Sequence, residues 1–308
     1  MQECPGVQPR DRVTVVIPVW GSYVDLLGDA VASVHAQEVP ARVIVVDNAS
    51  SPRVPAMDGV EVARSEVRLS CGGARNLGLS LVATEYVLFL DADDLLLPGA
   101  LTRLVAAFDR RPDCAALAGS IVDSDGARWR TPRRLAIGLA RWRRPFAWLN
   151  AVWMLTPTQG CAIMRTAAVR EAGGYADASS GEDWPLAASL AFRHDIAFDP
   201  APALIYRARS DSRGPGHAPP GTLLSNAAQV RRRLRDHPNV GGGSNALAAL
   251  AAAQAFASLV VHPLARALRR TSSLPAGFSG ARAAAPRRPA RERPQSPQDR
   301  LLGDLNRG

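Results

Sequence analysis

Three carboxylates stand together directly after an apolar run of the sequence. Residues 86–90, YVLFL, lead into Asp91, Asp93 and Asp94, and residues 95–99, LLLPG, follow them. Carboxylates this close repel one another, and holding them beside apolar surface costs free energy. A divalent cation such as Mg²⁺ or Mn²⁺ prefers oxygen ligands and would also bind the phosphate oxygens of a substrate. The alternative is that Asp93 and Asp94 cap a turn or helix, or lie in solvent.

Two further segments carry polar residues at the ends of apolar runs. Asp47 closes the apolar run 41–50, where it could accept hydrogen bonds from a ribose or a base, or could simply form an Asx turn. Arg75 lies in GGARNLG at 72–78, where it could contact a diphosphate or hold the aspartates in register.

A later acid pair, Glu182 and Asp183, opens a predicted helix. An acid at a helix start is favoured by the helix dipole alone, so each acid also has a purely structural interpretation. The chain has no GxxxxGK[ST] phosphate loop, no GxGxxG after the first strand and no GxSxG elbow. This argues against the common forms of P-loop nucleotide-binding enzymes, Rossmann dinucleotide-binding enzymes and α/β-hydrolases.

The elements that must position these residues alternate along the first part of the chain. Apolar runs predict strands at 12–20, 41–50, 60–66, 85–94 and 114–126. Helical spacing predicts helices at 23–37, 72–83 and 98–112. This alternation predicts an α/β fold with a mainly parallel sheet and helices on both faces. Ligands bind outside the carboxyl ends of such strands, so Asp47 and the Asp91–Asp94 group are expected on one rim.

The pattern changes after residue 126. Residues 160–175 predict a short strand, a helix and a glycine turn, and residues 180–194 a loop that opens a helix. The prolines in 195–210 predict a hairpin-like or edge-strand segment and not a central strand. Helices are predicted at 222–236 and 245–269.

Five segments in this order resemble the family-2 glycosyltransferases of the GT-A fold. They are VVIPVW, VVDNAS, GGARNLGL, FLDADD and GCAIMRTAAVREAGGY…GEDW, spread over residues 12–194. The resemblance implies a Rossmann-like GT-A domain and an inverting, hexosyltransferase-type transfer from a nucleotide-diphosphate sugar to a hydroxyl acceptor. It implies a divalent cation (Mn or Mg) as cofactor, and a place in glycan, glycolipid or cell-envelope polysaccharide synthesis.

The resemblance also implies a role for each matching residue. Donor-binding residues would be Pro18, Val19, Asp47, Arg75 and Asp91. Asp91 and Asp93 would form the DxD pair, with Asp93 making the direct metal contact. Asp183 would be the base that deprotonates the acceptor hydroxyl, and Glu182 and Trp184 would shape the acceptor pocket.

Two positions depart from the family pattern. Trp20 and Gly21 follow the IP pair, where Tyr followed by Asn or Glu is frequent. In YRARS, Arg209 occupies the place of a histidine that lies near the diphosphate or metal, and His217 is a candidate substitute. The third metal contact, and metal dependence itself, therefore stay open.

Positive charge is concentrated in two segments of a chain whose formal net charge is +9. Residues 128–144 hold seven arginines and no acid, and residues 271–308 hold seven arginines and three acids. The rest is close to neutral, which argues against a nucleic-acid-binding protein. The arginine–tryptophan segment 128–150 predicts contact with an anionic acceptor or a membrane surface, ahead of nucleic acid or a solvated loop.

The sequence predicts four parts. These are a tail (1–11), a GT-A domain (12–215, donor half 12–126 and acceptor half 127–215), a helical extension (216–270) and a disordered tail (271–308). The uncharged run 240–265 predicts a packing helix and not a membrane span. No apolar stretch opens the chain and the four cysteines form no CxxC pair. A cytoplasmic protein is expected, in contact with the inner membrane face at most, and the alternative function is a non-catalytic sugar-nucleotide or glycan-binding protein.

Overall fold

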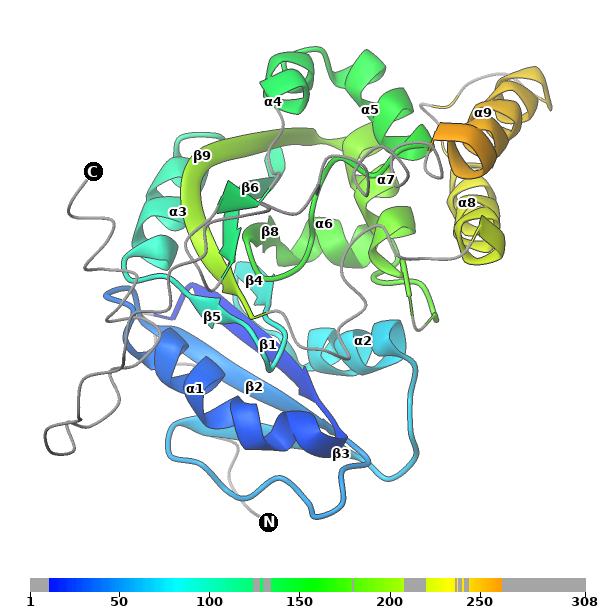
Figure 1. The fold of residues 1–308 in the computed structure, drawn as a ribbon. Coiled ribbons are helices and arrows are strands. Elements are labelled where there is room, and N and C mark those ends of the chain that lie inside the picture. The colour runs from blue at the N-terminus through cyan, green and yellow to red at the C-terminus, as the bar shows by residue number, and fades with distance from the viewer. Residues whose placement is uncertain are drawn as a thin grey trace, which may run out of the picture.

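A single nine-stranded sheet forms the centre of the computed structural model (Figure 1). The structure describes residues 11–123, 128–129, 134–178, 180–207, 220–235, 237, 240 and 244–261. The main path of the sheet has the order β3-β2-β1-β4-β8-β6-β9-β5, and β7 pairs with β6 outside that path. The predicted α/β class is confirmed.

The first four strands are parallel and form the half of the sheet that the sequence predicted most closely. They are β1 (Val13–Val19), β2 (Ala41–Asn48), β3 (Val60–Ser65) and β4 (Tyr86–Phe89). The linking helices are α1 (Val24–His35) and α2 (Cys71–Leu81), with a short 3₁₀ turn, η1 (Gly21–Tyr23), before α1. In register, Val19 lies opposite Asp47 and Val16 opposite Phe89, so the strand ends meet at one rim.

Each face of the sheet buries its own apolar cluster. Alternate β1 residues serve the two faces: Val15 and Ile17 pack with α1 and α3 (Ala100–Asp109), whereas Val16 packs with α2. The second cluster continues through the later helices α5 (Arg143–Val152), α6 (Thr166–Glu171) and α7 (Asp183–Arg193). The prediction of helices on both faces is therefore confirmed.

Antiparallel pairing enters the second half of the sheet. Its strands are β5 (Leu95–Leu96), β6 (Cys114–Asp123), β7 (Arg128–Trp129), β8 (Ala162–Arg165) and β9 (Asp195–Tyr206). Strand β8 inserts between β4 and β6 and runs antiparallel to both. The whole sheet is therefore mixed, and its parallel part is the half that carries Asp47 and Asp91.

Of the two alternatives predicted for 195–210, a hairpin-like or an edge-strand segment, the described part is not a hairpin, and residues 195–203 have a paired neighbour on one side only. Strand β9 is a single strand that lies between β6 and β5. Its prolines are accommodated because the pairing with β6 is irregular there, with register shifts on either side of the Ser120–Pro202 pair. On its other side β9 pairs with β5 only at Leu204 and Ile205, so no ladder is broken at Pro200 or Pro202.

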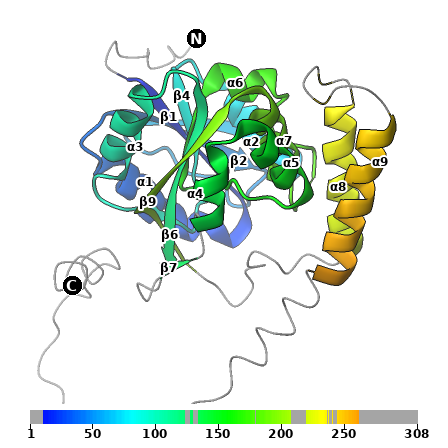
Figure 2. The ribbon, with the colours of Figure 1, turned by 90° about the horizontal axis from the view of Figure 1, so that it is seen from above.

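Two helices, α8 (Pro220–Leu234) and α9 (Ser244–Phe256), lie side by side outside α5 and α7 (Figure 2). A π-helical turn, η2 (Ala257–Val261), continues α9, and α4 (Arg134–Ala140) precedes α5. Gln254 of α9 donates to the Ala151 carbonyl of α5 at 2.8 Å and accepts from Arg231 of α8. None of the helices in the described part of the chain has the length and apolar character needed to cross a membrane.

Candidate active site at the carboxyl ends of the parallel strands

The Asp47 side chain, at the end of β2, is buried and accepts hydrogen bonds from three neighbouring residues. Its carboxylate, only 1 % exposed, accepts from the Ser50 amide at 2.9 Å, the Val54 amide at 3.2 Å and Arg64 Nη1 at 2.5 Å. Burial alone would raise the pKa of Asp47, but the hydrogen bonds from these residues outweigh it and hold the pKa below its ordinary value. The Asp47 carboxylate thus closes a local turn, through the amide three residues on and not the amide two residues on that defines an Asx turn. The predicted donor contact of Asp47 stays a prediction.

At the end of β1 the two predicted donor residues have little exposed surface, and their contact with the donor stays a prediction. Val19 is 1 % exposed and belongs to the core, and Pro18 is partly buried. The next residue, Trp20, is 48 % exposed, and the Arg68 guanidinium lies over its ring at 3.4 Å from the centroid. This exposed aromatic face beside the rim suits a flat base better than Val19 does. The sequence signal was present, because Trp20 is the residue at which the chain departs from the family pattern.

Arg75 joins two carboxylates that are far apart in the sequence. From the first turns of α2, it donates through Nη2 to Asp91 Oδ1 at 2.6 Å and through Nη1 to Glu182 Oε1. The guanidinium is 2 % exposed, and burial opposes its charge, but the neighbouring carboxylates, Asp91 first, hold its pKa well above the ordinary value. These contacts show the second of the two predicted roles, holding the acids in register. The predicted contact with a diphosphate stays a prediction.

The local sequence around Arg75 explains why its side chain points at the rim. Ser70 caps α2 by accepting from the Gly73 amide at 2.9 Å. At Gly72 a Cβ atom would come 1.8 Å from the Ala176 carbonyl oxygen, so only glycine lets the two backbones approach this closely. Asn76 then holds the backbone of Tyr175 with a pair of hydrogen bonds of 2.8 and 2.9 Å.

The three clustered acids have three different environments. The Asp91 carboxylate is 35 % exposed and paired with Arg75, and Asp93 is also partly exposed. Asp94 is 4 % exposed, and its Oδ1 accepts from the Arg207 amide at 3.1 Å. Burial, and then the charges of Asp91 and Asp93, raise the pKa of Asp94 well above its ordinary value. Asp94 therefore ties the turn to the end of β9, and the two accessible acids are the predicted pair, Asp91 and Asp93.

The later acid pair opens α7 on the same rim. Gly181, at φ +68°, turns the chain into Glu182, whose carboxylate accepts from Arg75 and from Gln159 Nε2 at 3.0 Å. Asp183 is 7 % exposed, and burial, reinforced by the charge of Glu182, raises its pKa to about 7. A carboxyl group with this pKa can take up a proton near neutral pH, as a general base must.

Trp184 lies in the core and not on an open surface. Its ring is 6 % exposed within the cluster of α5 and α7, and its Nε1 donates to the Asn150 carbonyl at 2.9 Å. This burial favours a structural role for Trp184. Its predicted contact with an acceptor, like that of Glu182, stays a prediction.

Two residues of the site were missed by the sequence interpretation. Gln159 binds Glu182, and the Tyr175 ring lies under the Arg75 guanidinium at 5.3 Å while its hydroxyl donates to Thr158 at 2.8 Å. Neither belongs to a spacing pattern, so the sequence offers no signal for them beyond the aromatic at the end of GGY. Arg209 and His217, the predicted candidates near the metal, lie outside the described residues.

The described residues contain no group of three or more His, Cys, Asp or Glu side chains placed to hold a metal. Asp91 and Asp93 nevertheless have the oxygen chemistry of a Mg²⁺ or Mn²⁺ ligand, and both are accessible. Two carboxylates fit a cation whose other ligands come from the oxygens of a bound diphosphate.

Comparisons with known proteins bear on the family and the fold of the chain. Residues 14–173 match the family described as glycosyl transferase family 2, which is just over half of the chain. "Succinoglycan biosynthesis protein ExoO" of Rhizobium meliloti (strain 1021) is 32 % identical over 113 residues. That match covers 34 % of this chain and 32 % of ExoO, so the chain spans only about a third of that relative's length.

Two groups of solved structures share the fold. S. aureus TarS 1–349, solved in complex with UDP-GlcNAc, has a TM-score of 0.60 at 16 % identity, over 80 % of this chain and 73 % of TarS. The mannosyltransferase PcManGT from Pyrobaculum calidifontis, solved with GDP-Man and Mn²⁺, has a TM-score of 0.51 at 16 % identity. That alignment covers 97 % of this chain and 80 % of PcManGT. At this identity the likeness shows the GT-A-type fold.

Proposed function

The chain belongs to glycosyl transferase family 2, and we propose that it is an inverting glycosyltransferase that moves a sugar from a nucleotide-diphosphate sugar to a hydroxyl acceptor. One observation carries the proposal. Arg75 holds Asp91, on the donor rim, and Glu182, beside the candidate base, with a single guanidinium. Metal-binding and proton-accepting carboxylates on one rim are what a single displacement between donor and acceptor requires.

On the donor side, the proposed ligands are the accessible acids and the exposed aromatic face. Asp91 and Asp93 would hold Mn²⁺ or Mg²⁺ together with the diphosphate oxygens, and the cation would neutralise the charge that develops on the leaving diphosphate. Trp20 would stack on the base. Asp47 already accepts from Ser50, Val54 and Arg64, so a ribose hydroxyl would have to share this carboxylate or displace Arg64.

On the acceptor side, Asp183 is the proposed base. The acceptor oxygen attacks the anomeric carbon as the bond from that carbon to the diphosphate oxygen breaks, and the acceptor proton passes to the Asp183 carboxylate. The nucleoside diphosphate leaves on the opposite face, which inverts the configuration. Glu182 helps to keep the pKa of Asp183 near neutral pH, because its negative charge adds to burial in raising that pKa to about 7.

The likeness to ExoO supports an extracellular or cell-envelope polysaccharide as the product, since succinoglycan biosynthesis is the role its name gives. TarS and PcManGT were solved with UDP-GlcNAc and GDP-Man respectively, which supports a sugar nucleotide as the donor class for this chain.

The test is a transfer assay on the purified full chain. A panel of UDP- and GDP-sugars is supplied with Mn²⁺ and with sugar or polyprenyl-linked acceptors, and both sugar transfer and donor hydrolysis are measured. Metal-dependent turnover of one donor is expected. Tight donor binding in a thermal-shift screen with no turnover for any acceptor would instead support a non-catalytic sugar-nucleotide-binding protein.

A further inference from the structure

The start of α5 carries a dense, exposed positive charge. Residues 141–145 are all exposed, and they include Arg141, Arg143 and Arg144. Segment 128–144 contains no acid, and no ion pair formed among the described residues involves these three arginines. These arginines take no part in the candidate active site, so the function proposed above leaves their charge unexplained.

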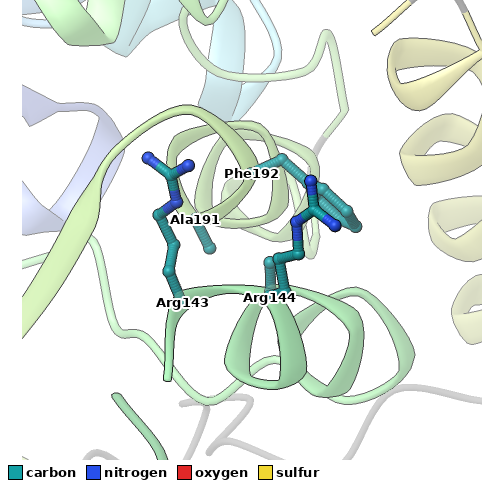
Figure 3. Close-up of a pocket in the computed structure, with 5 residues that line it drawn as sticks. Arg143, Arg144, Ala191 and Phe192 are labelled. Atoms are coloured by element: carbon teal, nitrogen blue, oxygen red, sulfur yellow. The ribbon is translucent and has the colours of Figure 1, made fainter. Parts of the chain in front are cut away.

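Two of the arginines flank a shallow hollow between α5 and α7. The hollow is lined by Arg143, Arg144, Ala147, Ala191 and Phe192. Figure 3 shows both arginine side chains extending from the first turn of α5 toward α7, with Arg143 beside Ala191 and Arg144 in front of Phe192. The apolar residues beneath the two arginines are buried, with Ala147, Ala191 and Phe192 at 1, 0 and 4 % exposed. The accessible surface there is therefore formed by the two guanidinium groups, which suit the phosphate groups of lipids.

Exposed apolar side chains accompany the arginines. Trp142 is 52 % exposed and Ile137, on α4, is 38 % exposed. The Arg141 guanidinium lies over the Trp142 ring at 4.3 Å from the centroid. Tryptophan with arginine at an exposed helix start is typical of groups that sit at the level of lipid headgroups.

A second apolar face lies on the helix that packs against α5. At the end of α9 and in the π-helical turn, Phe256, Leu259 and Val260 are 61, 54 and 46 % exposed. Their spacing of three and four residues places them on one face, while Gln254 of the same helix holds α5 through Ala151. Figure 1 shows α4, α5 and α9 at the end of the molecule away from α1. An exposed apolar face of this kind suits a bilayer better than a nucleic acid, whose backbone is charged.

We propose that the surface formed by Ile137, Arg141, Trp142, Arg143 and Arg144 docks on a membrane containing anionic lipid. The exposed guanidinium groups of Arg141, Arg143 and Arg144 bind lipid phosphates, Trp142 and Ile137 enter the interface, and the Phe256–Leu259–Val260 face adds apolar contact. This docking is independent of the reaction proposed above, since none of these residues takes part in it.

The test is sedimentation of the full chain with vesicles of phosphatidylcholine, with and without phosphatidylglycerol, at a fixed ionic strength. The unmodified chain should bind only the anionic vesicles. Arg143→Glu with Arg144→Glu should weaken that binding by at least about tenfold, because each arginine near an anionic surface contributes a several-fold gain. The matched control is Arg110→Glu with Arg111→Glu, the same charge change on two exposed arginines after α3, and it should retain most of the binding.

Two further variants leave the charge of the surface unchanged, so that the proposal does not depend on the folding of the charge-reversed variant alone. Trp142→Phe should remove the vesicle-induced blue shift of tryptophan emission, and Leu259→Ser with Val260→Ser should weaken binding without touching the charge. Equal vesicle binding by the unmodified chain and the Arg143–Arg144 variant would overturn the proposal. So would full release from vesicles by inorganic phosphate at matched ionic strength, which would indicate a site for a free anion. Binding to single-stranded RNA with none to anionic vesicles would overturn it in favour of nucleic acid.

Discussion

At the scale of single residues, the candidate site depends on one buried cation serving two acids. Breaking a buried ion pair leaves an uncompensated charge, which costs far more than losing an exposed pair. Glu182 has a side chain only 6 % exposed and lies next to Asp183, so its pairing with Arg75 also sets the charge that Asp183 experiences.

Replacing Arg75 with Met should destabilise the protein strongly. The change leaves Glu182 buried without its cation, for which about 3–5 kcal/mol of unfolding free energy is expected. Arg53→Gln is the matched control, because the Arg53–Glu66 pair is exposed and its loss should cost less than about 1 kcal/mol. Urea unfolding of both variants measures the difference, and similar losses for the two would show that Arg75 does not act as a buried bridge.

Asp183→Asn should reduce transfer about 10²- to 10⁴-fold while donor affinity stays unchanged. Asp195→Asn, at an exposed acid in the same half of the chain, is the control and should keep full activity. Steady-state kinetics and donor titration separate the two effects. Undiminished transfer by the Asp183→Asn variant would remove Asp183 from the mechanism.

The pH profile follows from the raised pKa of Asp183. Only the ionised carboxylate accepts a proton, so kcat/KM should fall as the pH drops below about 7 and level off above it. A carboxylate with an ordinary pKa would keep full activity down to about pH 5. A profile that stays flat from about pH 5 to about pH 7 would contradict the proposed protonation state.

At the scale of elements, the acid pair is positioned by contacts from two neighbouring helices, α8 and α2. Gly181 precedes Glu182 at φ +68°, and a Cβ atom there would come 2.0 Å from Asn226 Nδ2 of α8. Helix α8 therefore supports the start of α7, while α2 supports the preceding loop through Gly72 and Asn76.

Gly181→Ala should lower kcat with little change in donor affinity. Both the positive φ and the contact with Asn226 must be relieved, which shifts the start of α7 and costs on the order of 1–2 kcal/mol. Gly28→Ala is the matched control, since nothing lies within 4 Å of the added Cβ. That helix-interior change should stabilise the protein by about 0.5–1 kcal/mol. A kcat unchanged in the Gly181→Ala variant would show that the turn does not position Asp183.

At the scale of the whole molecule, the later helices act on the site from outside the sheet. Arg233 of α8 donates to the Ala172 carbonyl at 2.9 Å and to the Gly174 carbonyl at 2.6 Å, at the end of α6 and just before Tyr175. This contact links the C-terminal helices to the loop that carries Tyr175 under Arg75.

Arg233→Met should therefore lower both stability and kcat. Loss of charge-assisted hydrogen bonds to three carbonyls, those of Ala172, Gly173 and Gly174, is expected to cost about 1.5–3 kcal/mol. The neighbouring Arg232→Met removes an exposed arginine of the same helix and serves as the control, with little effect expected. Thermal unfolding and kinetics of the pair measure the coupling, and equal behaviour of the two variants would show that α8 does not support the site.

The sequence was sufficient for the parallel half of the fold and for the position of the rim. Apolar periodicity places strands and helices locally, and parallel pairing then puts Asp47 and Asp91 at the same rim of the sheet. It could not place β8 between β4 and β6, or β9 between β6 and β5, because strand order depends on packing between distant segments. Tyr175 and Gln159 were missed for the same reason, since their partners lie far away in sequence.

Because the Arg75 guanidinium is shared by Asp91 and Glu182, it has a thermodynamic consequence for donor and acceptor binding. A cation that draws Asp91 toward a donor diphosphate would weaken the ion pair between Asp91 and Arg75. The pairing of Arg75 with Glu182 would then become stronger. We therefore expect donor and acceptor affinities to be linked, and by reciprocity each ligand then changes the affinity for the other by the same factor. Calorimetric titration of an acceptor with and without a non-hydrolysable donor measures that factor. A value of one would mean that the two half-sites bind their ligands without cooperativity.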